Sequence, residues 1–404
     1  MQTLLSQHRP FVKFWIAQTV SGFGYQMLTL ALGWQLYELT GSAMDLGLVG
    51  LAQFIPAFAL ALVVGQVADR GDRRRIVFTC ASINCIIAGV MVAGSLQHWL
   101  GREVIFACVF VLGATRGFES PTMQALLPIV VDKALLPRAL ASSSASRQAA
   151  ALAGPALGGF IYLAGPATVY GLSAAFFLAA SLLILSVHVP NAPSTREPLT
   201  LQSVFGGITY VWGKPVVLGA ISLDLFAVLL GGATALLPIY AKDILGTGSW
   251  GLGLLRSAPA IGALSTAAWL AHHPIQSGVG KKLFVSVAAF GAFTVCFGLS
   301  ESLPLSMLML ALLGATDMVS QVIRHSLVQL ETPNEMRGRV SSIHSIFIGT
   351  SNQLGQFESG LTAAWWGAVP AVVVGGVGTI VIAALWMKLF PELRKRQVLT
   401  TGAH

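Results

Sequence analysis

The chain has 404 residues, of which 55% are hydrophobic and only 10% are charged, and its formal net charge is +8. Soluble globular proteins carry about 25% charged residues, so this composition excludes an ordinary soluble fold. The four cysteines fall inside apolar segments, without the spacing of metal ligands and without a soluble loop for disulfides. We therefore expect neither a metal site nor a cofactor.

Apolar runs long enough to cross a bilayer as helices recur along the whole chain, since about 20 helical residues span the hydrocarbon core. The first run continues from Trp15 to about Leu39, which is too long for a cleaved signal peptide. The sequence predicts an all-α polytopic membrane protein with twelve transmembrane helices in two six-helix bundles. The expected spans are 15–38, 45–68, 76–97, 103–127, 138–163, 167–188, 215–240, 250–272, 282–300, 303–328, 338–363 and 367–389.

The longest polar connection is residues 189–214. Three prolines (Pro190, Pro193 and Pro198) open it, and apolar residues then recur at helical spacing as far as Trp212. This pattern predicts an amphipathic helix on the cytoplasmic surface, with a plain linker as the alternative. It divides the chain into an N-terminal bundle (1–188), a linker (189–214) and a C-terminal bundle (215–404).

The basic residues predict the orientation. Eighteen of the 24 Lys and Arg residues fall on one side of the expected spans, and only Arg102 and Lys242 fall on the other. Under the positive-inside rule both termini are cytoplasmic, in the inner (plasma) membrane of the cell. Because the Lys and Arg residues are distributed over short loops between spans and do not form one basic surface patch, we expect no nucleic-acid partner.

The loop between spans 2 and 3, GQVADRGDRRR from Gly65 to Arg75, concentrates six charged residues. A plain topology marker is one interpretation. The spacing of Gly65, Asp69, Arg70 and Arg73 also resembles the signature loop of the major facilitator superfamily, although Asp72 stands where that family usually has glycine. The resemblance implies a gate: a charged turn that pairs with a neighbouring helix end in one transporter state and releases it in another.

Span 5 contains a second pattern, Gly154-Pro155-x-x-Gly158-Gly159. Small residues let helices approach closely, and Pro155 removes one helical hydrogen bond. Ordinary helix packing explains these residues on its own. In the major facilitator superfamily a motif of this order in span 5 is associated with exporters that exchange substrate for protons, and the resemblance implies the same conformational role here.

The resemblance extends over nearly the whole chain, through segments such as FESPTMQALLPIVV and SNQLGQFESG. It is to the enterobactin-exporter-like branch, which is grouped with drug:proton antiporters. It implies export of small organic molecules by alternating access. The alternatives are a siderophore exporter and a lipid or lysolipid flippase on the same fold. We expect a monomer whose partners are the substrate, protons and membrane lipids. No HExxH, GxSxG or Walker motif is present, so we expect no enzyme activity.

Ionisable residues inside spans are costly and mark functional sites by default. There are eight: Arg116, Glu119, Arg147, Asp224, Arg256, Asp317, Arg324 and Glu358. Asp317 and Asp224 have no partner nearby in sequence, which makes them the first and second candidates for carrying a proton, ahead of Glu119 and Glu358. Structural ion pairs, Arg116–Glu119 and Arg256–Glu358, are the alternative interpretation, and Arg324 is expected to be a structural or gate contact.

Polar and aromatic side chains on spans 1 and 2 suggest a substrate pocket. Tyr25, Gln26 and Gln53 offer hydrogen bonds and an aromatic wall. Trp34 and Gln35 belong to the same group, although Trp34 suits an interfacial aromatic belt equally well.

Overall fold

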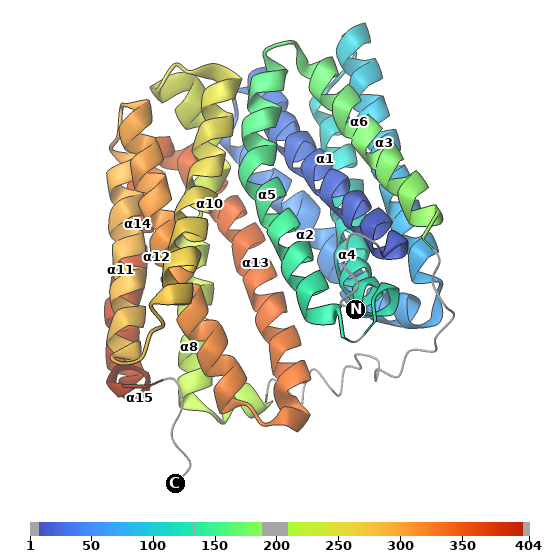
Figure 1. Cartoon of the computed structure of the whole chain (residues 1–404). Coiled ribbons are helices and arrows are strands. Elements are labelled where there is room, and N and C mark those ends of the chain that lie inside the picture. Colours follow the sequence, from blue (N-terminus) through green and yellow to red (C-terminus); the bar gives the residue numbers. More distant parts are fainter. Residues whose placement is uncertain (1–7, 133, 188–208, 399–404) are drawn as a thin grey trace. The chain divides into compact units, whose positions relative to one another are not determined.

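The computed structural model describes residues 8–132, 134–187 and 209–398, and this part of the chain folds into helices without strands. Figure 1 shows the helices as long rods. Helices are the expected result of the apolar runs, because a segment in lipid must satisfy its backbone hydrogen bonds internally. The prediction of an all-α membrane fold is confirmed.

The first half forms six long helices, each within a few residues of a predicted span. They are α1 (Arg9–Thr40), α2 (Ala43–Arg70), α3 (Arg73–Gln97), α4 (Arg102–Val130), α5 (Leu136–Tyr162) and α6 (Pro166–Leu185).

The second half repeats the pattern with one interruption. Its elements are α8 (Pro215–Leu230), η2 (Ala233–Leu236), α9 (Leu237–Ile239), η3 (Tyr240–Ile244), α10 (Gly248–His272), α11 (Val279–Gly298), α12 (Leu303–Glu331), α13 (Asn334–Trp366), α14 (Ala368–Leu389) and α15 (Pro391–Lys395).

Eight of the spans in the described residues are long and apolar enough to cross a membrane by composition alone, counting Pro215–Ile244 as one. The other four long helices are α1, α5, α10 and α13, with 32, 27, 25 and 33 residues. Each exceeds the roughly 20 residues that a span requires, and together the two groups are consistent with the predicted twelve.

The two halves repeat the same helix packing. In the first half α1 packs against α4, α5 and α6, and α3 packs against α4 and α6. In the second half α8 packs against α12, α13 and α14, and α11 packs against α12 and α14. The pairs are equivalent when α8 corresponds to α1, α11 to α3 and α12 to α4. An internal six-helix repeat of this kind is typical of transporter folds.

By their contacts the residues form two compact units, defined here as unit 1 (Met1–Gly41, Ala52–Leu199 and Gly248–Ser257) and unit 2 (Ser42–Leu51, Thr200–Thr247 and Ala258–His404). The first turns of α2 are therefore part of unit 2, and the first turns of α10 are part of unit 1. The predicted division at residues 189–214 stays a prediction, because residues 188–208 lie outside the described part of the chain.

The span expected over residues 215–240 is present, but its helix is interrupted. Helix α8 ends at Leu230, and a 3-10 turn, a short α-helix and a π-helix follow. The interruption begins at Gly231 and Gly232, which are poor helix formers. A Cβ on Gly232 would lie 2.6 Å from the Gly355 carbonyl oxygen of α13, so only glycine allows this close approach.

The end of the linker packs on unit 2. Residues 209–212 are helical, Val211 is buried against Val217, Ile221, Val328 and Val340, and Trp212 is 72% exposed. The Tyr210 hydroxyl donates a hydrogen bond of 2.8 Å to the Glu331 carbonyl oxygen. The described end of the segment thus has one buried and one exposed face, while the predicted amphipathic helix over 189–208 remains a prediction.

Candidate functional site

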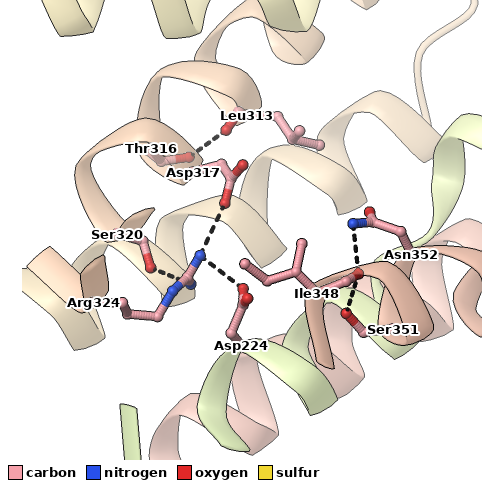
Figure 2. Close-up of polar contacts among 9 residues, drawn as sticks. All are labelled: Asp224, Leu313, Thr316, Asp317, Ser320, Arg324, Ile348, Ser351 and Asn352. Carbon is pink, nitrogen blue, oxygen red and sulfur yellow. Dashed lines mark hydrogen bonds and ion pairs between the residues drawn. The ribbon is translucent and has the colours of Figure 1, made fainter. Parts of the chain in front are cut away.

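A charged cluster lies within unit 2, between α8 and α12. The Arg324 Nη2 atom lies 2.7 Å from the Asp224 Oδ1 atom and 3.7 Å from the Asp317 Oδ1 atom. Arg324 Nη1 also donates a hydrogen bond of 2.7 Å to Ser320 Oγ. Figure 2 shows both carboxylates directed at one nitrogen of the guanidinium group. Asp317, Ser320 and Arg324 follow one another at helical spacings of three and four residues, which places them on one face of α12.

Burial within the cluster is unequal. The side chains of Asp224 and Arg324 are 6% and 5% exposed, whereas the Asp317 side chain is 41% exposed. The three residues line a cavity of about 10 Å³, which is close to the room that one water molecule needs. With all groups ionised the cluster carries one net negative charge, and Asp317 is the more exposed of its two carboxylates.

The expectation that Asp224 and Asp317 lack a partner is wrong, since both pair with Arg324. The partner was missed because it is seven residues away from Asp317 along α12 and on a different helix from Asp224. The structure therefore places Arg324 in an ion-pair cluster with both proton-coupling candidates.

A second polar region lies within unit 1, where α1, α4 and α5 enclose a cavity of about 260 Å³. Its charged lining residues are Arg116, Glu119 and Arg147. The guanidinium of Arg116 lies 4.4 Å from the centroid of the Tyr25 ring, which is a cation–π geometry. Arg147 donates a hydrogen bond of 3.4 Å to Ser143, one helical turn earlier.

The carboxylate of Glu119, which lines the cavity, is fixed by hydrogen bonds from α1 and α3. It accepts hydrogen bonds from Ser21 at 2.6 Å and from Asn84 at 3.5 Å, and its side chain is buried. Thr115 donates to Asn84 at 2.6 Å, which fixes the amide in turn. Ser21 and Asn84 were not predicted from the sequence, although Asn84 is a polar amide within the apolar run of span 3.

Two ion pairs within the membrane were considered from the sequence, Arg116–Glu119 and Arg256–Glu358, and the structure bears on only the first. Glu119 bonds to Ser21 and Asn84 while Arg116 lies on Tyr25, and the described residues record no Arg116–Glu119 ion pair. Arg256 belongs to unit 1 and Glu358 to unit 2, so their pairing stays a prediction. The Glu358 carboxylate accepts a hydrogen bond from Ser359, and its carbonyl oxygen accepts one from Thr362, both on the same helix.

The signature loop lies between α2 and α3. Helix α2 ends at Arg70, and the side chains of residues 61–70, which include Asp69, lie outside the described part. Asp72 caps α3 by accepting a 3.0 Å hydrogen bond from the Arg74 backbone N–H. Its φ of −67° does not require glycine, so the departure from the family pattern is compatible with the turn.

The first two arginines of α3 reach backbone carbonyls near the ends of other unit 1 helices. Arg73 donates to the carbonyl oxygen of Ala125 at 3.4 Å, and Arg74 donates to that of Val187 at 3.1 Å. Carbonyl groups at helix C-termini lack intrahelical partners and carry partial negative charge, so cations stabilise them.

The glycines of span 5 permit close helix crossings within unit 1. A Cβ on Gly154 would lie 2.6 Å from Gln26 Cβ, and one on Gly158 would lie 3.1 Å from Met27 Cα, both in α1. Gly159 contacts the first turn of α10, where the Ser249 hydroxyl donates to its carbonyl oxygen at 3.1 Å. Helix α5 continues through Pro155 without a break.

Two of the three pocket candidates line the same cavity. Tyr25 and Gln26 line the cavity of unit 1, but Gln53 does not and instead has its backbone against Gly113 of α4. Gln35 accepts a hydrogen bond of 2.6 Å from the Tyr170 hydroxyl inside the helix bundle. Trp34 is only 4% exposed, so it is a core residue and not part of an interfacial belt.

The unequal burial of the unit 2 cluster predicts unequal effects of charge removal. Asp224→Asn should destabilise the protein by on the order of 3 kcal/mol, because it deprives a buried guanidinium of its nearest charge. Asp317→Asn should change stability by less than about 1 kcal/mol, because Asp317 is more exposed. The measurement is the thermal unfolding midpoint of purified protein in detergent. The double variant Asp224→Asn/Arg324→Gln should recover part of the loss, and a larger effect of Asp317→Asn would contradict this geometry.

Comparison with known proteins places the whole chain in one family. The model of the family described as "Transmembrane secretion effector" matches residues 5–400. Enterobactin exporters EntS from Citrobacter koseri and from Escherichia coli O1:K1 are each 27% identical to the chain over 405 residues, covering 97% of this chain and 94% of theirs.

Solved structures share the fold at lower sequence identity. A bacterial homologue of the human lysosomal transporter Spinster, inward-facing and unoccupied, has a TM-score of 0.75 at 13% identity and covers 96% of this chain and 99% of its own. A mutant of the nucleoside transporter NupG has a TM-score of 0.74 at 14% identity and covers 94% and 100%. The family match, the relatives and the fold agree: the chain belongs to the transmembrane secretion effector family of the major facilitator superfamily, and it is a multi-pass membrane transporter.

Proposed function

We propose that the protein exports small organic molecules from the cytoplasm by alternating access, in exchange for protons. The observation that carries this proposal is the cluster of Asp224, Arg324 and Asp317, in which two carboxylates share one guanidinium. Carboxylates inside membrane helices are rare and mark proton relays or transport pathways. Here one carboxylate is buried in an ion pair and the other remains accessible, so the two have separate roles.

In the proposed cycle Asp317 carries the proton and the pair of Arg324 with Asp224 persists. Protonation of Asp317 removes the net negative charge of the cluster and weakens the hold of Asp317 on Arg324. An ion pair with one exposed partner is worth up to about 1 kcal/mol. A change of that size alters the ratio of two conformations up to about fivefold, which biases an alternating-access equilibrium.

The substrate class is proposed from the relatives. Two of them are named enterobactin exporters and share 27% identity with almost the entire chain, which supports a siderophore as one candidate substrate. A lipid or lysolipid flippase on the same fold is the alternative, since fold does not determine substrate. An untargeted comparison of exported metabolites and membrane lipids, with and without the gene, distinguishes these candidates.

We further propose that the protein acts as a monomer in the inner membrane with both termini in the cytoplasm. Ser277, between α10 and α11, and Ser302, directly before α12, are both exposed and suit a matched pair of Ser→Cys substitutions in a variant without native cysteines. A membrane-impermeant maleimide applied to intact cells should label Ser302→Cys and spare Ser277→Cys until the cells are opened. Labelling of both positions from outside would overturn the topology.

Asp69 and Arg73 are proposed to form the cytoplasmic gate. Asp69→Asn should leave the protein folded and inserted but reduce export about tenfold or more, because losing a charge-assisted pair shifts the populations of the transporter states. Export is measured in cells and compared with membrane protein levels. Undiminished export by this variant would show that the loop serves topology alone.

Proton coupling is tested by substrate efflux from proteoliposomes with an imposed pH gradient. Asp317→Asn should abolish uphill, gradient-driven export while allowing downhill exchange, because one carboxylate that changes protonation has been removed from the cycle. Asp224→Asn should reduce both processes together, because it weakens the site itself. If both variants pump uphill at the wild-type rate, the coupling carboxylate is instead Glu119 or Glu358.

A further inference from the structure

Two arginines line the cavity of unit 1 without a carboxylate partner in the described residues. Arg116 lies near the middle of α4 and Arg147 near the middle of α5, and both side chains are exposed. Arg116 contacts the Tyr25 ring, and Arg147 donates to Ser143. Exposed cations at this depth are costly against lipid, so they almost always face a water-filled cavity within the bundle. Both guanidinium groups are thus accessible to a ligand in the cavity.

Glu119 is the one acidic group among the residues that line this cavity, and it is already engaged. One of its carboxylate oxygens accepts from Ser21 and the other from Asn84, and the residue is 3% exposed. Two guanidinium groups against one buried carboxylate leave a net positive charge in the cavity. A cavity with that net charge favours an anion.

The remaining lining supplies groups that suit an organic anion. Gln26, Gln124 and Gln148 contribute amides, and Tyr25 contributes an aromatic ring. The planar fork of arginine matches the two oxygens of a carboxylate better than an ammonium group does. A cavity of about 260 Å³ has room for a ring that carries an acid group.

We propose that Arg116 and Arg147 form an anion subsite that binds the carboxylate, or a similar oxyanion, of the exported molecule. This inference rests on the proposed function and adds the substrate class: organic anions rather than cationic or neutral compounds. The same chemistry would also bind the headgroup of an anionic lipid, and the experiment below separates the two sources.

The test uses the purified full-length chain in a nonionic detergent, with benzoate and benzamide as probes. The two compounds share a ring and a shape but differ in charge. At equal ionic strength benzoate should raise the thermal unfolding midpoint in a saturable manner, because a ligand that binds the folded state stabilises it, and benzamide should not. Equal effects of the two compounds, or no effect of either, would overturn the subsite.

Variants assign the response to the two arginines. Arg116→Gln and Arg147→Gln should each weaken the apparent affinity for benzoate at least about tenfold. Arg138→Gln is the matched control, because Arg138 is an exposed arginine on the same helix as Arg147 but outside the cavity. If a Gln variant aggregates, Arg147→Lys keeps the charge and should retain weaker binding. Wild-type affinity in all cavity variants would assign benzoate to another site.

The lipid source is tested by adding phosphatidylglycerol or phosphatidylcholine to the detergent micelles. If only phosphatidylglycerol removes the benzoate response, the subsite binds a lipid headgroup and the assignment to exported molecules is wrong. If neither lipid removes it, the assignment stands. This assay needs no gradient, so its failure is distinguishable from a failure of proton-coupled export, which is measured in proteoliposomes.

Discussion

The guanidinium of Arg324 holds two carboxylates, and in a membrane helix bundle this arrangement constrains everything around it. Asp224 on α8 and Asp317 on α12 can share Arg324 only while those helices pack together, as they do in unit 2. A buried charge without its partner is strongly destabilising, so the ion pair fixes the local packing as well as the chemistry. The accessible position of Asp317 leaves one carboxylate free to change protonation without dismantling that packing.

The internal repeat gives the two polar regions equivalent places. The cavity of unit 1 has charged residues on α4 and aromatic and polar residues on α1, and the cluster of unit 2 has its charges on α12 and α8. Since α12 corresponds to α4 and α8 to α1 in the packing pattern, the two regions share one helix pair of the repeat, to which the unit 1 cavity adds Arg147 of α5. The chemistry has diverged: unit 1 presents excess positive charge and unit 2 excess negative charge. This divergence supports separate roles for the halves, with substrate recognition in one and proton exchange in the other.

Much of the fold could be predicted from the sequence, because a lipid environment leaves a long apolar run few options other than a helix. The interruption after Leu230 could not be located in the same way, because glycine also occurs within uninterrupted helices such as α5. The break at Gly231 and Gly232 coincides with the close approach of Gly355, which the sequence does not reveal. The contacts within the charged cluster of unit 2 could be predicted less well from the sequence. Residue identity indicated that Asp224 and Asp317 were important, but their shared partner depends on which face of α12 packs against α8.

The anchoring of Glu119 illustrates the same limit. Its distance of three residues from Arg116 suggested an ion pair, yet the carboxylate binds Ser21 of α1 and Asn84 of α3, and the guanidinium turns to the Tyr25 ring. Local spacing fixes the face of a helix on which a side chain lies, whereas its partner is decided by competition among neighbouring helices.

In the proposed cycle, Asp317 is the carboxyl group that gains and loses the proton. Infrared difference spectroscopy of the purified protein, titrated with pH, reports the carbonyl stretch of protonated carboxyl groups directly. The account predicts a band that grows as the pH falls, is retained in Glu358→Gln and is absent in Asp317→Asn. A band of undiminished intensity in Asp317→Asn would contradict it.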